Sequence, residues 1–229
     1  MKRLLIFTGL LVAAIITLQA KDFSFKVEVT GKGKPMLLIP GLSSSGDVWD
    51  ETVARLQDQY ECHVVTLPGF AGQPAIETDQ FLETVGDELI SYIKRNKLKN
   101  PVVMGHSLGG FLTVYIGIRE PDLASKLIVV DGLPYMGAAQ NPVATPEAMK
   151  ATAEMMRNNI LSQTEEQFEQ MQPVILRSMI TSPEKVSVAM DWSRSSDTKT
   201  VAQAMFELYQ IDLRDQLDQA KAPMLVLGS

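Results

Sequence analysis

Ser107 is the side chain in this sequence whose surroundings most clearly suit covalent chemistry. It lies at the centre of residues 105–109, which read GHSLG and match the pattern G-x-S-x-G. Glycines two residues to either side leave room for a tight, strained turn that pushes the serine hydroxyl toward solvent. A hydroxyl presented in this way can attack a carbonyl carbon and form an acyl intermediate. Because so short a pattern also arises by chance, its value depends on the elements around it.

The segments on either side of Ser107 predict a strand followed by a helix. Residues 102–104 are an apolar run that leads into the motif. From residue 109 onward, a predicted helix has Phe111, Leu112, Tyr115 and Ile118 on one face. A helix that begins beside the serine directs its free backbone N–H groups toward negative charge that develops there. This context favours a functional serine over an ordinary loop residue.

The rest of residues 23–131 alternates between predicted strands and predicted helices. A period of two predicts a half-exposed strand at 23–30, and continuous apolar runs predict buried strands at 35–39, 62–67, 101–104 and 127–131. Apolar residues at helical spacing predict helices at 47–60 and 79–97. This alternation implies right-handed crossovers and a mostly parallel sheet with helices on both faces. Functional groups of such a sheet gather beyond the carboxyl ends of its strands.

With GHSLG between a strand and a helix, and with residues 67–72 reading LPGFAG, the sequence resembles the α/β-hydrolase superfamily over nearly everything after residue 22. The resemblance implies an α/β-hydrolase fold and makes Ser107 the expected nucleophile. It also implies an oxyanion hole formed by the backbone N–H groups of Leu42 and Leu108.

The loop that would supply Leu42 departs from the family's pattern. That loop usually reads His-Gly-x in the family, whereas this chain has Pro40 in place of the histidine. Because the donor is a backbone N–H group, the replacement need not remove it. The alternative interpretation of residues 40–49 is an ordinary connecting loop rich in glycine and serine.

Residues 133–222 interrupt the alternation, because about ninety residues pass without a predicted strand, whereas a bare crossover needs only about a dozen. Helices are expected at 146–159, 164–179, 183–192 and 198–213. In the family, an insertion after this strand is a helical lid over the active site. The expected organisation is a signal peptide (1–20), a core (21–132), a helical lid (133–222) and the start of a returning, buried core strand (223–229).

Methionine is concentrated in the predicted lid, which holds eight of the twelve methionines, at positions 136, 149, 155, 156, 171, 179, 190 and 205. Methionine adapts its shape to irregular surroundings. These side chains could therefore roof a pocket for an apolar acyl or alkyl group. The alternative is that they fill gaps between the lid helices.

The partners that a nucleophilic serine needs are missing from this sequence. A serine hydrolase uses a histidine as the base and a carboxylate that orients it, in the chain order serine, acid, histidine for this fold. Of the two histidines, His106 is adjacent to Ser107 and its side chain diverges from it, while His63 precedes the serine and is expected to be structural. Asp131 ends a strand and is an alternative acid, but it has no histidine to orient.

Two explanations of this gap remain open. The sequence is either an incomplete record of a hydrolase whose acid and histidine follow residue 229, or a complete protein without the catalytic machinery. An apolar strand at 223–227 with no closing helix favours the first explanation. The corresponding functions are a serine hydrolase that cleaves an ester, lactone, thioester or small amide, and a binding protein of the same fold for a small apolar ligand.

The amino terminus and the composition restrict the location and the partners. Lys2 and Arg3 precede an apolar stretch at 4–18, which is typical of a signal peptide and short for a membrane anchor, so we expect export to the periplasm or beyond the cell and no stable membrane insertion after cleavage. Removing residues 1–20 leaves 19 basic and 27 acidic residues, a net charge of −8, which disfavours nucleic acid as a partner.

The supply of soft ligands is too small to predict a metal site or a cofactor. The sequence has two histidines and one cysteine, so no ligand cluster is expected. Cys62 cannot form an internal disulfide and is expected to be a small buried side chain. A small-molecule acyl substrate, of apolar character, is the partner that the sequence favours.

Overall fold

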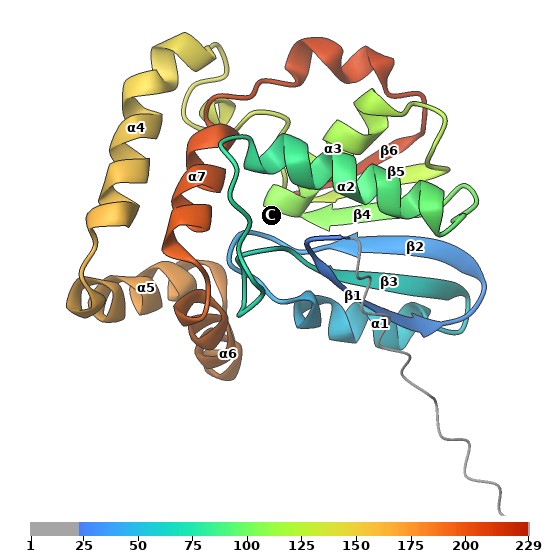
Figure 1. Ribbon diagram of the computed structural model, residues 1–229, viewed down its shortest axis with the longest axis horizontal. Helices are drawn as coiled ribbons and strands as arrows, with labels where there is room; N and C mark the ends of the chain where they lie inside the picture. The colour runs from blue at the N-terminus through green and yellow to red at the C-terminus, as the bar shows by residue number, and fades with distance from the viewer. Residues whose placement is uncertain (1–22, 229) are drawn as a thin grey trace, which may run out of the picture.

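The computed structural model describes residues 23–228, so the predicted signal peptide at 1–20 lies outside the described residues. Its centre is a six-stranded sheet with the strand order β1-β3-β2-β4-β5-β6 (Figure 1). The strands are β1 (Lys26–Gly31), β2 (Lys34–Ile39), β3 (Tyr60–Thr66), β4 (Val102–His106), β5 (Lys126–Val130) and β6 (Met224–Leu227). Strand β1 runs antiparallel to β3, and the other neighbours are parallel. The expected mostly parallel α/β fold is confirmed.

Helices cover both faces of the sheet. The 3-10 helix η1 (Gly46–Trp49) and α1 (Asp50–Leu56) lie on one face, and α2 (Phe81–Arg95) and α3 (Leu108–Arg119) lie on the other (Figure 1). Strand β2 shows why both faces must be covered. Its Met36 and Leu38 join a cluster with Trp49, whereas Leu37 and Ile39 join the main core. Because side chains alternate along a strand, a continuous apolar run requires apolar layers on both sides.

Four long helices lie between β5 and β6, and we call residues 133–222 the helical insert. They are α4 (Pro146–Ser162), α5 (Glu165–Met179), α6 (Pro183–Arg194) and α7 (Thr198–Leu208), with the 3-10 helices η2 (Met136–Ala139) and η3 (Arg214–Gln219) at either end. Each of the four helices has an N-cap side chain that accepts a hydrogen bond from a backbone N–H group in the first turn; the N-cap residues are Thr145, Thr164, Ser182 and Asp197. Such caps satisfy donors that a helix start leaves free. Within residues 23–228, no helix is both long and apolar enough to span a bilayer.

Several elements differ at their ends from the sequence-based expectation. The helix predicted at 47–60 begins as η1 and ends at Leu56, because Tyr60 already pairs with Lys34 in the sheet. The helix predicted at 198–213 ends at Leu208, and Leu213 instead donates its N–H to the Pro134 carbonyl at 3.0 Å. The first strand begins at Lys26, not at residue 23.

The prediction of a buried strand at the end of the chain was wrong in one respect. Strand β6 does form and pairs with β5 in parallel. However, Leu225, Val226 and Leu227 are 46–61% exposed. Strand β6 is the edge of the described sheet, so its outer side lacks the neighbour that its apolar sequence implies.

The methionines of the helical insert fall into two groups, one packed between elements and one on the surface. Met149 and Met190 are buried, and Met136, Met156 and Met205 pack partly buried against the clusters of the insert or the core. These five fill gaps between helices, as methionine does in irregular cores. In contrast, Met155, Met171 and Met179 are more than half exposed. Gap filling therefore explains part of the methionine enrichment, and a second group lies on the surface.

Helix α3 crosses the sheet at a distance that glycine alone permits. A Cβ atom on Gly109 would overlap the Ile39 carbonyl oxygen and lie 2.6 Å from the Pro40 carbonyl oxygen. A Cβ atom on Gly105 would overlap the Gly109 carbonyl and lie 2.5 Å from Thr113 Oγ1. The glycines on both sides of Ser107 thus bring β4, α3 and the end of β2 into direct backbone contact.

The helical insert is joined to the core by a buried carboxylate. Glu207 of α7 is 5% exposed and accepts the N–H groups of Phe81 and Leu82, each at 2.7 Å. These groups are free donors at the start of α2, where Gln80 provides no side-chain cap. Gln203 donates a third hydrogen bond to Glu207 at 2.7 Å. Burial raises the pKa of Glu207, and the three hydrogen bonds oppose that shift.

We expect Gly109→Ala to destabilise the protein, although alanine ordinarily stabilises a helix by about 1 kcal/mol relative to glycine. The added methyl group would force the backbones of α3 and β2 apart, at a cost of about 3 kcal/mol. Urea denaturation followed by circular dichroism measures the change. Gly228→Ala, where an added Cβ has no neighbour within 4 Å, is the control and should change stability by less than about 0.5 kcal/mol. Equal stability of the two variants would contradict the close crossing.

We expect Glu207→Ala to lower the free energy of unfolding by about 3 kcal/mol, because it leaves two buried N–H groups at the start of α2 without an acceptor. Glu77→Ala changes an exposed carboxylate and should remain within about 0.5 kcal/mol of the parent. Urea denaturation of both variants makes the comparison. A loss that is the same for both would show that Glu207 does not hold the insert to the core.

Candidate active site

Ser107 occupies a strained turn between β4 and α3. Its backbone has φ 53° and ψ −116°, in a region that residues other than glycine rarely adopt. Two backbone hydrogen bonds hold it there: the Ser107 N–H donates to the Val130 carbonyl at 2.9 Å, and the Ser107 carbonyl accepts from Phe111 at 3.1 Å. The side chain does not cap α3, and its hydroxyl has no hydrogen-bond partner among residues 23–228. The half-buried hydroxyl is therefore available to a ligand.

The loop after β2 passes directly over Ser107. A Cβ atom on Gly41 would lie 3.3 Å from Ser107 Cβ and 3.1 Å from His106 Nδ1. Leu42 follows, partly buried against the main core. Ser44 fixes the loop, because its N–H donates to the Gly41 carbonyl at 3.3 Å and its hydroxyl donates to the Leu42 carbonyl at 3.2 Å. The N–H group of Leu42 has no acceptor among residues 23–228, so the loop brings a free donor near the serine.

Leu108 supplies a second free donor. It is the first residue of α3, its side chain is fully buried, and its N–H group has no acceptor in the described part of the chain. The start of a helix carries partial positive charge from its aligned peptide dipoles. Two such donors beside a nucleophile can stabilise the oxyanion of a tetrahedral intermediate. The loop that contains Leu42 lies against Ser107, and Leu108 is the residue that follows Ser107 in the chain. That their N–H groups form an oxyanion hole stays a prediction.

His106 and Asp131 lie close to Ser107 without forming a catalytic pair with it. His106 Nδ1 is buried against Gly41 and has no hydrogen-bond partner in the structure of residues 23–228. Burial lowers the pKa of His106, and the charge of Asp131 opposes that shift. Asp131 is exposed, has a φ of 48° and donates its N–H to the Leu227 carbonyl at 2.7 Å. The carboxyl ends of β2, β4 and β5 thus gather the expected polar groups at one edge of the sheet.

His63 belongs to the core, as its position in the sequence predicts. It is 5% exposed, and its ring nitrogens hydrogen-bond the Tyr92 hydroxyl at 2.7 Å and Glu61 Oε1 at 3.0 Å. Burial lowers the pKa of His63, while Glu61 favours the charged form. Burial also raises the pKa of Tyr92 to about 12, so the phenol stays protonated. Both ring nitrogens are engaged within the fold, and His63 is not available to Ser107.

Residues 23–228 contain neither an exposed thiol nor a cluster of metal ligands. Cys62 is fully buried, and burial raises the pKa of its thiol, which opposes formation of the reactive thiolate. Within residues 23–228, no group of three or more histidine, cysteine, aspartate or glutamate side chains is placed to hold a metal ion.

Two cavities lie away from Ser107. One of 590 Å³ is at the opposite end of the sheet, beside Lys34 and Lys97, and one of 370 Å³ lies between α5 and α6, beside Arg177 and Val186. Neither is lined by Ser107, Leu42 or Leu108.

Sequence reasoning missed the contacts that hold the insert beside this edge. The turn after β3 is tied to the junction of α6 and α7: the Asp197 N–H donates to the Gly69 carbonyl at 2.7 Å, and the Gly72 N–H donates to the Ser195 carbonyl at 3.0 Å. The Ala71 N–H donates to Ser196 Oγ at 3.0 Å. Gly69 and Gly72 have positive φ, and their places in LPGFAG were the available signal of a special turn.

Known proteins are similar to this chain both in sequence and in fold. Residues 36–227 match the model of the Alpha/beta hydrolase family. The chain is 29% identical over 203 residues to a pimeloyl-[acyl-carrier protein] methyl ester esterase of Vibrio atlanticus, covering 87% of this chain and 76% of that protein. It is 27% identical over 201 residues to the enzyme of the same name from Vibrio cholerae, with the same coverage.

Solved structures with low sequence identity have the same fold. A hydrolase from Pseudomonas aeruginosa superposes with a TM-score of 0.76 at 14% identity, covering 90% of this chain and 76% of that one. The enol-lactonase from Burkholderia xenovorans gives a TM-score of 0.74 at 16% identity, covering 89% of this chain and 77% of that one. Since the model of the family matches residues 36–227, which is most of the sequence, this chain belongs to the alpha/beta hydrolase family.

Proposed function

We propose that this protein is a serine hydrolase that cleaves a carboxylic ester, or a related lactone, thioester or small amide, through an acyl-enzyme on Ser107. The observation that carries the proposal is the strained position of Ser107 between two free backbone donors, those of Leu42 and Leu108. Esterases and hydrolases among the relatives support ester hydrolysis as the reaction class. The methyl ester named for the Vibrio relatives makes a small methyl ester the first substrate to try.

The proposed reaction has two steps. Ser107 Oγ attacks the ester carbonyl carbon while a base removes the hydroxyl proton, and the carbonyl oxygen becomes an oxyanion that accepts hydrogen bonds from Leu42 and Leu108. The carbon–oxygen bond to the alkoxy group then breaks, and the alcohol leaves with the proton. Water attacks the acyl-enzyme in the second step, the acid is released and Ser107 regains its proton.

We place the base, and the acid that orients it, in a later segment of the chain than residue 229. The histidines of the described residues support this placement, because His63 is engaged by Glu61 and Tyr92 and His106 packs against Gly41. The exposed apolar side chains of β6 also support it, since a further strand and helix would cover them. In this proposal the helical insert is the lid over Ser107, and residues 1–20 direct the protein to the periplasm or outside the cell.

A binding protein of the same fold is the second candidate. The observation that favours it is that Ser107 Oγ has no hydrogen bond to a histidine or a carboxylate within residues 23–228. A serine without a base is a weak nucleophile. Such a protein would hold a small apolar ligand beneath the helical insert without turning it over.

The product of the natural gene should be heavier than residues 21–229. We expect its intact mass and C-terminal peptide map to include an aspartate or glutamate and then a histidine beyond Ser229, because Ser107 needs both groups. The mass of the mature amino terminus tests the signal peptide in the same measurement. A natural protein that ends at Ser229 would contradict the triad proposal and favour the binding protein.

Ser107→Ala, made in that full-length product, should lower the rate of hydrolysis of p-nitrophenyl acetate and monomethyl pimelate by about 10⁴-fold or more, because it removes the attacking oxygen. It should also abolish covalent labelling by a fluorophosphonate probe. Ser162→Ala, at the exposed end of α4, is the matched control and should retain both. Activity that survives in Ser107→Ala would overturn the nucleophile assignment; ligand binding without turnover in the parent protein would support the second candidate.

A further inference from the structure

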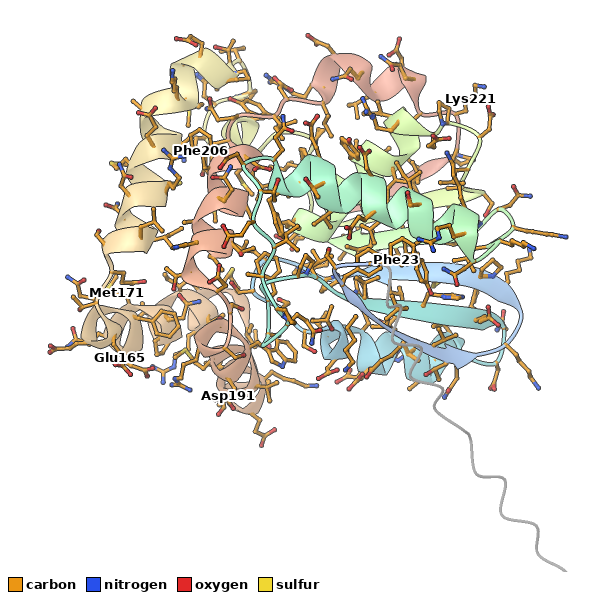
Figure 2. All side chains as sticks on the ribbon, in the orientation of Figure 1. Phe23, Glu165, Met171, Asp191, Phe206 and Lys221 are labelled. Atoms are coloured by element: carbon orange, nitrogen blue, oxygen red, sulfur yellow. The ribbon has the colours of Figure 1, made fainter. Side chains whose placement is uncertain are left out.

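The larger of the two cavities lies at the amino edge of the sheet, where the parallel strands begin. Its volume is 590 Å³, and its walls are the turn between β1 and β2 and the loop between α2 and β4 (Figure 1). In Figure 2, Lys221, which precedes β6, marks this side of the molecule, and Phe206 of α7 marks the opposite side, where the four long helices of the insert lie. We call this space the amino-edge cavity. It shares no lining residue with the candidate active site.

Backbone hydrogen bonds fix the wall that the turn between β1 and β2 forms. The Lys32 N–H donates to the Gln57 carbonyl at 3.1 Å, and the Lys34 N–H donates to the Gln59 carbonyl at 3.2 Å. The turn is therefore held against the start of β3. Lys34 is exposed at the side of the cavity, and its backbone is kept in place by these bonds.

The opposite wall is the carboxyl end of α2, which closes in a Schellman motif. The Leu98 N–H donates to the Ile93 carbonyl at 3.0 Å, and the Lys97 N–H donates to the Lys94 carbonyl at 3.1 Å. Leu98 is buried, so the loop is anchored in the core. Lys97 and Lys99, on either side of Leu98, are exposed and line the cavity.

Lys97 occupies a position that ordinarily belongs to glycine. In a Schellman motif the residue after the helix cap has a left-handed backbone, and Lys97 has a φ of 54°. A side chain there is sterically unfavourable, and glycine avoids the penalty. A positive charge near the end of a helix would be a structural explanation, but Lys94 and Arg95 already provide it in the last turn of α2. The strained lysine is better explained by the cavity that it lines.

The amino-edge cavity carries a local positive charge in a chain that is acidic as a whole. Lys34, Lys97 and Lys99 line it, and within residues 23–228 their ammonium groups form no ion pair. Glu61 is the carboxylate in the lining, and it is hydrogen-bonded to His63 at 3.0 Å. Three lysines and one glutamate give the lining a net charge of +2, whereas the chain has 27 acidic and 21 basic residues. The positive charge of the cavity therefore does not follow from composition.

The residue types in the lining indicate which anion fits. An ammonium group is a compact charge with three donors and suits the several oxygens of a phosphate, whereas arginine is the better match for a planar carboxylate. Within residues 23–228 the lining contains neither an arginine nor an aromatic ring that could stack on a nucleobase. The amides of Gln59 and Asn96 add further donors. The adjoining residues Lys32 and Asp58 are exposed and carry opposite charges, so the balance stays positive.

We propose that the amino-edge cavity is a binding site for a polar ligand that carries phosphate, held by Lys34, Lys97 and Lys99. Its volume is in the range of small-molecule sites. The ligand is either a free phosphate compound or the headgroup of a phospholipid, and both share the chemistry that the lysines recognise. Because the cavity and Ser107 lie at opposite edges of the sheet, this site is independent of the proposed function.

Two binding measurements on the full-length product of the natural gene test the proposal and distinguish the two sources of phosphate. Calorimetric titration with sodium tripolyphosphate at about 0.1 M salt tests a free ligand. Sedimentation with phosphatidylcholine vesicles that contain phosphatidic acid tests a headgroup, and vesicles of phosphatidylcholine alone are the control. Saturable binding of either probe is the expected result, and binding of neither would overturn the site. Ester turnover is not needed, so this result and the failure of the proposed function are separate.

Single charge removals locate the binding. Lys34→Gln, Lys97→Gln and Lys99→Gln should each weaken binding of the probe by about threefold or more. Lys150→Gln removes an exposed lysine from α4, on the far side of the molecule, and is the matched control. It should leave the affinity within about 1.5-fold, because it lies well beyond a screening length. Equal weakening by Lys150→Gln would show attraction by overall charge and overturn the site.

Removing the carboxylate from the lining should have the opposite effect. Glu61→Gln keeps an oxygen that can bond His63 but loses the negative charge, so the probe should bind about threefold more tightly. An unchanged or weaker affinity would contradict contact between the ligand and this part of the cavity.

Lys97→Gly separates binding from stability. It should weaken binding as much as Lys97→Gln does, yet raise the melting temperature by about 3 °C relative to that variant, because glycine relieves the left-handed backbone. A lysine that served only α2 would behave differently. Both variants would then lower the melting temperature and leave the affinity for the probe unchanged, and that outcome would overturn the proposal.

Discussion

The backbone contact between α3 and the ends of β2 and β4 is the constraint on which the site depends. Gly109 lies against the carbonyls of Ile39 and Pro40, and Gly105 lies against the Gly109 carbonyl. No side chain fits between these backbones, so the chain has no room for a relaxed turn at Ser107. Its positive φ is therefore imposed by the packing around it. The same contact brings Gly41 against the serine, and with it the free N–H of Leu42.

The site also requires that the helical insert keeps a fixed position relative to the carboxyl edge of the sheet, where Ser107 lies. Glu207 satisfies donors at the start of α2, an element more than a hundred residues away in the sequence, and the turn after β3 is hydrogen-bonded to the start of α7. Both links use polar groups that are satisfied only when insert and core are together, so a displaced α7 would leave them unpaired.

The fold was largely predictable because its signals are local. Apolar runs marked the central strands, and helical spacing marked α2 and α3. The position of Ser107 followed from its glycines. The role of Glu207 could not be predicted, because a single glutamate in a helix carries no sign of the distant amides that it will bind. The exposure of β6 could not be predicted either, since an apolar strand indicates burial, and burial depends on neighbours that sequence pattern does not supply.

Within residues 23–228 the outer side of β6 has no neighbouring strand, which has a consequence for any form of the protein in which this side stays uncovered. An edge strand offers unpaired N–H and C=O groups in a regular row, and natural sheets commonly guard such rows with lysine, proline or a bulge. Strand β6 reads MLVL and carries none of these guards. Where nothing covers it, the row is a template for the same strand of a second molecule. Self-association through β6 would then increase with protein concentration. The fraction of monomer in a preparation would depend on dilution and on whether another strand pairs with this edge during synthesis.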